Sequence, residues 1–535
     1  MISADSPTID HTKPTSLIDA LCRIVGEDNV LRSDSDRQFY SQDIFTQGIA
    51  CAVVVRPHSA DEIARIAIAT TASGYDLVTR GGGMSYTAGY LPVRPQSVII
   101  DMARMNHILE INQTDMYVTV EAGCTWDSLR RALEPTGLRS PYWGPLSGLK
   151  STIGGALSQN SVFFGSGLNG TAADTVIGMT IVRADGAIVT TGSAGGTNAN
   201  AFFRHYGPDL TGLFTGDAGA FGIKVAATLR LVKRKPAQRY ASFAFDDRHA
   251  LITAMQSIAR DGLATECFAF DPFLQSVRMK RAGLMSDVQT LAAVVQGQGS
   301  IVRGLKEGLR MAVAGRRFAK GVDWPLHVAL EERNDPAADA ALEDVRMIAI
   351  AAGGRETENT VPKAVHAAPF GPMNGMVGVD GERWVPVHGV VPNSRVERFF
   401  AALDALYRDR ADDMDRHGVT SGYLITTIGP GASLIEPVFY WPDALMDIHT
   451  RSVEPAFLAK LPRHQPQEDA RAFVAQLRRA VIDLFVDVGA IHFQIGKTYP
   501  LHRTRSPGAA DLLDDIKARL DPNGAINPGA LGLAG

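Results

Sequence analysis

Apolar positions in the first 230 residues fall in short strand-like runs, separated by amphipathic stretches and glycine-rich joints. Residues 52–55 form a β-branched run, and Ser59 begins a capping box that predicts a helix with Ile63 and Ile66 on one face. A second strand-like run, residues 77–79, then enters a turn of consecutive glycines. A strand, a helix, a strand and a glycine turn therefore follow one another within about thirty residues.

The same mixture of elements continues to about residue 231. The alternating run at residues 117–121 predicts a strand, and Thr125 predicts the cap of the helix that follows it. Asp185 and Gly186 predict a hairpin turn, because both residue types tolerate a positive φ. Mixed strands and helices with glycine-rich joints predict an α+β domain in this part of the chain.

Beyond residue 236 the glycines thin out, and longer helical patterns alternate with strands to about residue 437. Residues 469–488 then predict a long amphipathic helix. Its apolar stripe consists of Phe473, Leu477, Val481 and Phe485. Another helix is predicted to begin at Ser506, with proline in its first turn, and to stop at residues 521–524. We therefore expect a second domain followed by two C-terminal helices.

The length and composition agree with a folded protein of at least two domains. A chain of 535 residues exceeds what one hydrophobic core usually organises. Hydrophobic residues make up 45% of the chain and charged residues 21%, which is typical of globular proteins. The formal net charge of -4 offers no basic excess to neutralise phosphates, so nucleic acid is not an expected partner.

The cysteines and the apolar runs bear on location. The chain has four cysteines, at irregular spacing that fits neither a disulfide framework nor a CxxC metal site: Cys22, Cys51, Cys124 and Cys267. The N-terminal residues lack a basic segment followed by an apolar stretch, and no apolar run approaches the ~20 residues of a membrane helix. We therefore expect a soluble, cytoplasmic protein without an integral membrane segment.

Residues 80–90 (RGGGMSYTAGY) directly follow a predicted strand and contain four glycines. Glycines expose backbone N–H groups and permit positive φ, so such a loop can approach a diphosphate closely. By itself this pattern is equally typical of a tight surface turn. The loop is not the GxGxxG fingerprint of a Rossmann dehydrogenase, and no acidic residue follows at the spacing that binds a ribose.

Further motifs stand in order around this loop. They are RP at 56–57, VEAG at 120–123, STIGG at 151–155, GPDLTGLF at 207–214, GAFGI at 219–223 and DPNGAINPG at 521–529. With the glycine loop they resemble the FAD domain of the vanillyl-alcohol oxidase/p-cresol methylhydroxylase (PCMH) superfamily. The resemblance covers residues 52–231 and the end of the chain.

The resemblance implies a PCMH-type, two-part FAD-binding domain of the α+β class with an inserted α+β substrate domain. The implied boundaries are an N-terminal extension at 1–45, an FAD-binding domain at 46–236, a substrate or cap domain at 237–480, and a C-terminal segment at 481–535 that returns to the FAD domain. The implied FAD-binding residues are Arg80, Gly81, Gly82, Gly83, Met84, Ser85, Tyr86, Gly89, Ser151, Thr152, Gly154, Gly155, Ser158, Gly165, Gly222, Ile223 and Asn527.

The resemblance also bears on how the FAD is attached. Members of the superfamily often link the flavin through a histidine in the pyrophosphate loop, and Met84 stands at that place here. No cysteine occurs in the flavin-lining run 147–167. We therefore expect non-covalent FAD, while His366 and His388 leave open a link through the substrate domain.

Residues 491–500 (IHFQIGKTYP) supply candidate catalytic groups on a predicted strand. Oxidation of an alcohol needs a group that accepts the hydroxyl proton and a positive charge that binds an anionic substrate. His492 is the candidate base, and Lys497 or Arg503 would bind the anion. A hydrogen-bonded structural histidine explains His492 equally well. Relatives acting on D-2-hydroxy acids have a Glu-His pair here, and Ile491 replaces the glutamate, so no metal is expected.

Two other groups concern the substrate. His388 lies in a strand-like run, 382–389, that resembles the substrate-domain strands covering the flavin, although a packing strand is the alternative. Residues 388–393 (HGVVPN) depart from the His-x-Gly-Asp-Gly-Asn pattern of hydroxy-acid dehydrogenases. Tyr499 and Arg503 resemble the adjacent tyrosine-arginine pair of the phenol oxidases, with extra residues between them. The aromatic run 439–442 with Arg451 fits an aromatic substrate or simply core.

The leading hypothesis is an FAD-dependent dehydrogenase or oxidase that converts a 2-hydroxy acid, or a related secondary alcohol, to its carbonyl product by hydride transfer to flavin N5. The same chemistry on para-substituted phenolic, vanillyl-type alcohols is the alternative. A flavin-dependent transferase without redox turnover is a second alternative. The sequence leaves open the electron acceptor, whether oxygen, a quinone, a cytochrome or an electron-transfer flavoprotein, and it is compatible with a homodimer.

Overall fold

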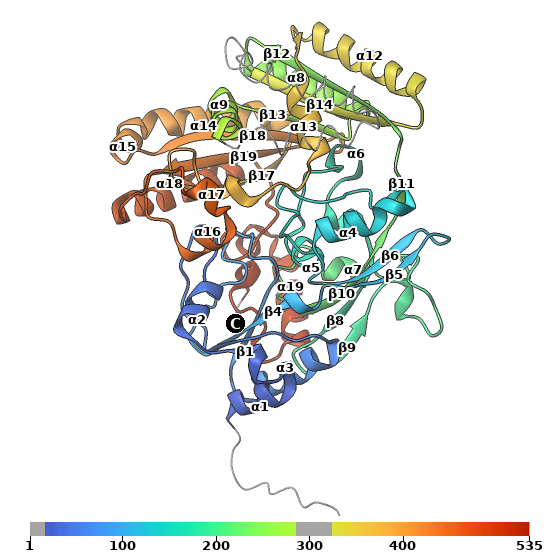
Figure 1. Ribbon diagram of the computed structural model, residues 1–535, viewed down its shortest axis with the longest axis vertical. Coiled ribbons are helices and arrows are strands. Elements are labelled where there is room, and N and C mark those ends of the chain that lie inside the picture. The colour runs from blue at the N-terminus through green and yellow to red at the C-terminus, as the bar shows by residue number, and fades with distance from the viewer. Residues whose placement is uncertain (1–15, 285–323, 534–535) are drawn as a thin grey trace, which may run out of the picture.

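The computed structural model describes residues 16–284 and 324–533. Three sheets, of four, five and two strands, form a first lobe, and one eight-stranded sheet forms the core of a second lobe. In Figure 1 the first lobe is the lower one, and the C-terminus returns to it among the N-terminal elements. The α+β class and the two-part arrangement predicted from the sequence are therefore confirmed.

The N-terminal sheet of the first lobe is mainly parallel. Its strands and helices are β1 (Val30–Leu31), β2 (Val53–Val55), β3 (Asp76–Arg80), β4 (Ser97–Asp101), α1 (Leu17–Val25), α2 (Asp34–Tyr40) and α3 (Ala60–Ala72). Ser59 caps α3 by accepting from the backbone N–H of Glu62 at 3.2 Å, as its capping box predicted. Strand β1 pairs with β2, so the described part of the expected N-terminal extension belongs to this sheet. The first fifteen residues lie outside the described residues.

The second sheet of the first lobe is antiparallel, in the order β5-β6-β10-β8-β9. Its elements, with a neighbouring strand pair, are β5 (Ile108–Asn112), β6 (Tyr117–Glu121), β8 (Val176–Val182), β9 (Ile188–Thr190), β10 (Ile223–Arg230), β7 (Leu138–Arg139), β11 (Val232–Lys233), α4 (Trp126–Leu133), α5 (Ile153–Gln159), α6 (Ser166–Asn169) and α7 (Leu210–Leu213). Thr125 caps α4, and Gly186 turns the β8–β9 hairpin at φ +78°, both as predicted.

The second lobe is one antiparallel sheet partly covered by helices. Its strands are β12 (Ala237–Phe245), β13 (Glu266–Phe270), β14 (Trp324–Glu332), β15 (Arg355–Thr357), β16 (Arg383–Pro386), β17 (Gly389–Pro392), β18 (Thr420–Ile428) and β19 (Ala432–Trp441). Its helices are α8 (Arg248–Arg260), α9 (Pro272–Leu284), α12 (Asp335–Ala351), α13 (Thr360–Ala367), α14 (Val396–Asp409), α15 (Ala411–Arg416), α16 (Asp447–Ser452), α17 (Pro455–Leu458) and α18 (Glu468–Asp487).

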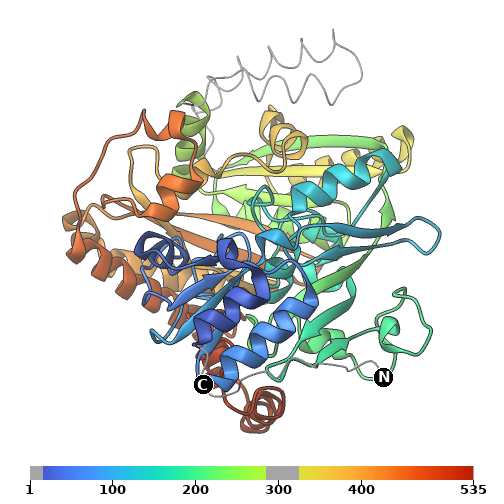
Figure 2. The ribbon, with the colours of Figure 1, turned by 60° about the horizontal axis from the view of Figure 1, so that its bottom comes forward.

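Alternation along the strands decides what each face of this sheet meets. On β19, Ile435, Phe439 and Trp441 point into the hydrophobic core, where the α14 residue Tyr407 packs against Phe439. Helices α8, α12 and α18 contact the sheet, and Figures 1 and 2 place α8 and α12 at the far side from the first lobe. The other face of β19 is left to meet the first lobe. No helix within the described ranges is both long and apolar enough to cross a bilayer.

The C-terminal segment adds to the first sheet. Residue Ile526 bridges Leu77 of β3 in parallel, and Leu77 exchanges backbone hydrogen bonds of 2.8 Å with the tail. The last helix, α19 (Pro507–Leu520), carries Lys517, whose buried ammonium donates to Asp521 and to two backbone carbonyls at 2.6–2.9 Å. This lysine fastens the tail to the first lobe.

Replacing the fastening lysine tests its contribution to stability. Lys517→Met leaves the Asp521 carboxylate buried without its cation, so the free energy of unfolding is expected to fall by about 3–5 kcal/mol. Denaturant unfolding followed by circular dichroism measures this. The exposed Lys233 provides the control, since Lys233→Met should change stability by less than about 0.5 kcal/mol. Equal stability of the two variants would contradict the assignment.

Candidate cofactor and substrate site

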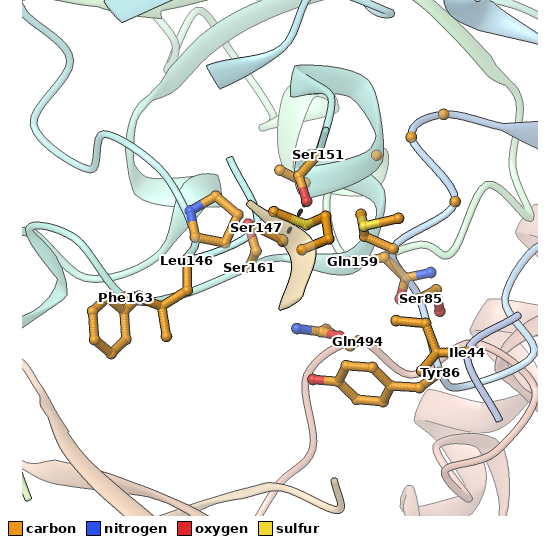
Figure 3. A pocket seen from close by; sticks show the side chains of 18 of the residues that line it. Ile44, Ser85, Tyr86, Leu146, Ser147, Ser151, Gln159, Ser161, Phe163 and Gln494 are labelled. Carbon is orange, nitrogen blue, oxygen red and sulfur yellow. Dashed lines mark hydrogen bonds between the residues drawn. The ribbon is translucent and has the colours of Figure 1, made fainter. Parts of the chain in front are cut away.

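A cavity of about 690 Å³ lies where the two lobes meet. The first lobe contributes the glycine loop after β3, residues around α5 and the stretch before β10. The second lobe contributes β16, β18, β19, α9 and residues 364–376. Figure 3 shows part of the lining, with Tyr86 and Gln494 close together and Ser147 beside Ser151. This volume is in the range of sites that bind small molecules and cofactors.

The glycine loop forms a wall that has no room for side chains. A Cβ atom on Gly81 would overlap the Thr152 hydroxyl, and one on Gly82 would overlap the backbone carbonyl of Lys150. Gly83 also has φ +71°, which side chains rarely adopt. Backbone N–H groups can therefore come close to a bound anion here, which fits the diphosphate of a dinucleotide.

Helix α5 and the residues before it form a neighbouring wall. Ser147 and Ser151 are hydrogen-bonded at 2.6 Å (Figure 3). The Thr152 side chain caps α5. Gln159 also lines the cavity, and its Oε1 atom is buried without a hydrogen-bond partner within the described part of the chain. A buried acceptor without a partner is costly, so this atom fits the N–H edge of a bound ring system.

Asn527 closes the glycine loop from the C-terminal tail. Its Nδ2 atom donates to the carbonyls of Gly89 at 2.8 Å and Ala218 at 2.6 Å. Lys497 stands behind it and donates to Asn527 Oδ1 and to the Leu91 carbonyl, both at 2.6 Å. Burial lowers the pKa of Lys497 to about 7. Lys497 does not line the cavity, so it supports the loop instead of facing a substrate.

Most of the residues that the sequence assigned to FAD line the cavity. They are Gly81, Gly82, Gly83, Met84, Ser85, Tyr86, Gly89, Ser151, Thr152, Gly154, Gly155, Ser158, Gly222 and Asn527. Three others do not. The Arg80 guanidinium lies over the rings of Phe39, Tyr40 and Tyr90, the Gly165 N–H donates to Glu266, and Ile223 is in the hydrophobic core.

The predicted catalytic histidines pack behind the cavity wall. His492 Nδ1 is 2.8 Å from the His388 carbonyl, and its ring stacks on Tyr499 at 4.2 Å. The His388 ring stacks on Phe493 at 4.0 Å. Burial lowers the pKa of His492 to about 4 and that of His388 well below its ordinary value. Phe493 lines the cavity, whereas the two histidines and Tyr499 do not.

The predicted strand at residues 491–500 is wrong, which explains this placement. Only Ile491 forms an isolated bridge, and the chain then turns at Gln494, φ +52°, and Gly496, φ +55°. The Gln494 N–H donates to the Gln159 carbonyl at 2.7 Å, so a contact with the first lobe bends the segment. Gln494 therefore reaches the cavity. Arg503 lies on the surface, 3.2 Å from Asp483.

Several residues that sequence reasoning missed form the second-lobe side of the cavity. Leu434, Glu436 and Val438 alternate along β19 and line the cavity, together with Tyr440 from the predicted aromatic run 439–442. Trp384 of β16 and two α9 arginines, Arg278 and Arg281, join them. The sequence feature that could have indicated this side of the cavity is Glu436, a charged residue in the mainly apolar strand β19. Of the predicted aromatic group at 439–442, Tyr440 lines the cavity, whereas Phe439 and Trp441 are in the core and Arg451 lies over Phe39.

Burial controls the charges on this side of the cavity. Burial raises the pKa of Glu436 to about 7, and the charge of Arg278 opposes that rise. Burial also lowers the pKa of Arg278 to about 10, and its guanidinium lies 4.0 Å from the centre of the Phe270 ring. Arg281 donates to the Val377 carbonyl at 3.0 Å. A titratable carboxyl group and a cation therefore share an apolar chamber.

Sequence comparisons find a domain family in the first lobe and relatives that match part of the chain. The FAD binding domain family matches residues 51–192. The glycolate oxidase subunit GlcD of Bacillus subtilis is 33% identical over 215 residues, 40% of this chain and 44% of that protein. The mitochondrial D-lactate dehydrogenase [cytochrome] 1 of Saccharomyces cerevisiae is 25% identical over 272 residues, 49% of this chain and 45% of that protein. The chain thus spans less than half the length of these relatives.

Solved structures match nearly the whole chain. p-Cresol methylhydroxylase with substrate bound has a TM-score of 0.71 at 16% identity, covering 97% of this chain and 96% of that one. The 4-ethylphenol oxidase of Gulosibacter chungangensis, in its isoeugenol complex, has a TM-score of 0.69 at 17% identity and covers 97% of both chains. Alkyldihydroxyacetonephosphate synthase has a TM-score of 0.68 at 15% identity, covering 97% and 86%.

These matches and the glycine-lined cavity point the same way. The family match includes the loop whose backbone fits a diphosphate, and the structural matches share the fold of both lobes. The unpaired Gln159 acceptor and the tail residue Asn527 complete a lining that fits FAD. Residues 51–192 therefore form an FAD-binding domain with FAD as the cofactor, and the whole chain shares the fold of p-cresol methylhydroxylase.

Proposed function

We propose that this protein is an FAD-dependent oxidoreductase that oxidises an alcohol carbon in a substrate combining an apolar body with one acidic group. Bound FAD would supply the hydride acceptor, flavin N5. The observation that carries the proposal is that Glu436 and Arg278 line the same cavity as the glycine loop. Partly burying two charged groups in an apolar chamber is costly, and ionisable groups with shifted pKa values occur preferentially at functional sites.

The two charged side chains would have distinct roles. Oxidation of an alcohol to a carbonyl removes one hydride and one proton, and Glu436 would accept the hydroxyl proton. A carboxyl group whose pKa is about 7 is well matched to proton transfer near neutral pH. Arg278 would bind the acidic group of the substrate by charge-assisted hydrogen bonds. His492 is not assigned this role because it packs behind the wall.

The walls of the chamber favour an aromatic substrate over a two- or three-carbon acid. Tyr86 and Trp384 meet edge to face at 5.9 Å on one side, and Phe163 contributes a further ring. An aromatic ring packs well against such walls, whereas glycolate or lactate would leave them uncovered. The acidic group would then be a phenol, as in vanillyl-type alcohols. We therefore prefer phenolic alcohols to 2-hydroxy acids as the substrate class.

A 2-hydroxy acid with an apolar side chain is the second candidate. The relatives that match part of the chain include a glycolate oxidase subunit and a D-lactate dehydrogenase. Arg278 could bind a carboxylate as readily as a phenolate. We also propose non-covalent FAD, since Met84 stands in the loop and neither His366 nor His388 lines the cavity.

Anaerobic mixing of the purified holoprotein with substrates tests this function. Vanillyl-type alcohols are expected to bleach the flavin absorbance faster than 2-hydroxy acids with apolar side chains, and lactate and glycolate slowest, because only the larger compounds fill the chamber. Stopped-flow absorbance gives the rates. Bound flavin that no compound reduces would reject the oxidoreductase and favour a transferase of the same fold.

The protonation state of Glu436 predicts a pH profile. Since the base must be ionised and its pKa is about 7, kcat/KM should rise with pH and level off above about 7 to 8. Glu436→Gln should lower kcat by roughly 100-fold or more and remove this dependence. Glu397→Gln on the surface of α14 is the matched control and should keep the wild-type profile. An unchanged profile in Glu436→Gln would reject Glu436 as the base.

Loss of space in the glycine loop should abolish FAD binding. Gly82→Ala would push the loop away from the Lys150 carbonyl, so the folded variant is expected to purify colourless and stay colourless after addition of FAD. Gly508→Ala is the control, because a Cβ atom there meets open space. Absorbance at the flavin band and circular dichroism measure binding and folding. A folded, yellow Gly82→Ala protein would contradict the loop assignment.

A further inference from the structure

His366 of α13 lies between two buried carboxylates. Its Nδ1 atom is 3.3 Å from Glu266 Oε2, and its Nε2 atom is 3.3 Å from Glu331 Oε1. The Glu266 and Glu331 side chains are 3% and 5% exposed, and the histidine side chain is 9% exposed. Both ring nitrogens thus face acceptors, and only a protonated imidazole can donate to both at once.

The same carboxylates bind the first lobe. Glu331 forms a two-point ion pair with Arg139 of β7, with one contact of 2.8 Å. Glu266 accepts from the backbone N–H of Gly165 at 3.0 Å through its other oxygen. The cluster therefore joins α13, two neighbouring strands of the second-lobe sheet and two separate points of the first lobe.

The charges in this cluster balance only when His366 is protonated. Two carboxylates then face Arg139 and the imidazolium, whereas a neutral imidazole leaves one buried negative charge uncompensated. Two further ionisable residues in the described part of the chain contact the cluster: Tyr240, whose ring centre is 5.6 Å from that of His366, and Lys235, which donates to the Glu331 backbone carbonyl at 2.9 Å. Neither one supplies a cation to the imidazole.

The sign of the pH dependence follows from this environment. Burial opposes the charged ring, but the hydrogen bonds and charges of Glu266 and Glu331 prevail and raise the pKa of His366 to about 9. A group whose pKa is raised in the folded state stabilises that state fully below its ordinary pKa of about 6.5. This stabilisation is lost as the pH rises through about 9.

The helix that carries His366 is also a wall of the FAD cavity. Ala364 and Val365 line the cavity, and so do most residues of the following segment, 368–376. Phe370 of that segment packs on the first lobe, with its ring centre 5.8 Å from that of Phe164. A Cβ atom on Gly148 would overlap the Phe370 ring, so this contact too depends on a glycine.

We propose that the His366 cluster is a proton-operated clamp that holds the α13 wall of the FAD cavity against the first lobe and releases the wall when the imidazole loses its proton. His366 acts as a positioning residue, through the helix on which it stands. The clamp concerns access to the FAD cavity and does not depend on which substrate is oxidised. Access should therefore increase under alkaline conditions.

Hydrogen exchange of the FAD-loaded protein, read by mass spectrometry on peptides from residues 360–376, tests the clamp. After correction for intrinsic rates, wild-type exchange should be slow at pH 7 and rise at least about tenfold near pH 9 to 10. His366→Gln should exchange fast at both pH values. Glu266→Gln should move the wild-type transition down by about one pH unit or more, because one of the two carboxylate partners is lost.

The control is His249→Gln, which removes an exposed histidine from a surface pair with Glu397 and should behave as wild type. Glu266→Gln and the wild-type pH series keep the test decisive if His366→Gln fails to fold. A flat corrected exchange from pH 7 to 10 in the wild type would overturn the proposal, as would wild-type protection in His366→Gln. Because no substrate is used, either result is separate from the success or failure of the proposed oxidation.

Discussion

Direct backbone contact in the glycine loop is the constraint on which the rest of the structure depends. Gly82 lies against the Lys150 carbonyl, and a Cβ atom on Gly154 of α5 would lie 2.7 Å from Ala122 Cβ. Because these backbone segments lie so close together, they leave no space for side chains. Side-chain packing within the loop therefore cannot hold its conformation. It must be fixed by groups from elsewhere in the chain, and the fold is arranged to bring those groups to it.

The supports of the loop come from three distant segments. Asp43 accepts from the Ala88 N–H at 2.7 Å, Arg478 of α18 donates to the Tyr86 carbonyl at 3.1 Å, and Asn527 donates to the Gly89 carbonyl at 2.8 Å. One support precedes the first-lobe core, one belongs to the second lobe and one to the tail. The FAD site therefore forms only when both lobes and the C-terminal segment have come together.

Local features could be predicted from the sequence, while contacts between lobes could not. Ser59, Thr125 and Gly186 decide their own caps and turns within a few residues, so their patterns were sufficient. His492 was misplaced because the bend at Gln494 depends on a hydrogen bond to the first lobe. Glu436 was not recognised because a single glutamate in an apolar run does not by itself indicate a site. Its role depends on α9, which brings Arg278 into the same cavity.

Backbone strain in the cavity supports chemistry over simple storage of a cofactor. Four non-glycine residues with positive φ line it: Phe163, Ala218, Gln494 and Asn527. Such conformations cost about 1–3 kcal/mol each and persist only where surrounding contacts fix them. At Gln494 the backbone N–H donates to the Gln159 carbonyl while the side chain lies close to Tyr86, so one strained residue contacts two walls. Strain, a half-buried carboxyl group and a half-buried cation thus occur together where the lobes meet, which is what an orienting, reactive site requires and a passive binding site does not.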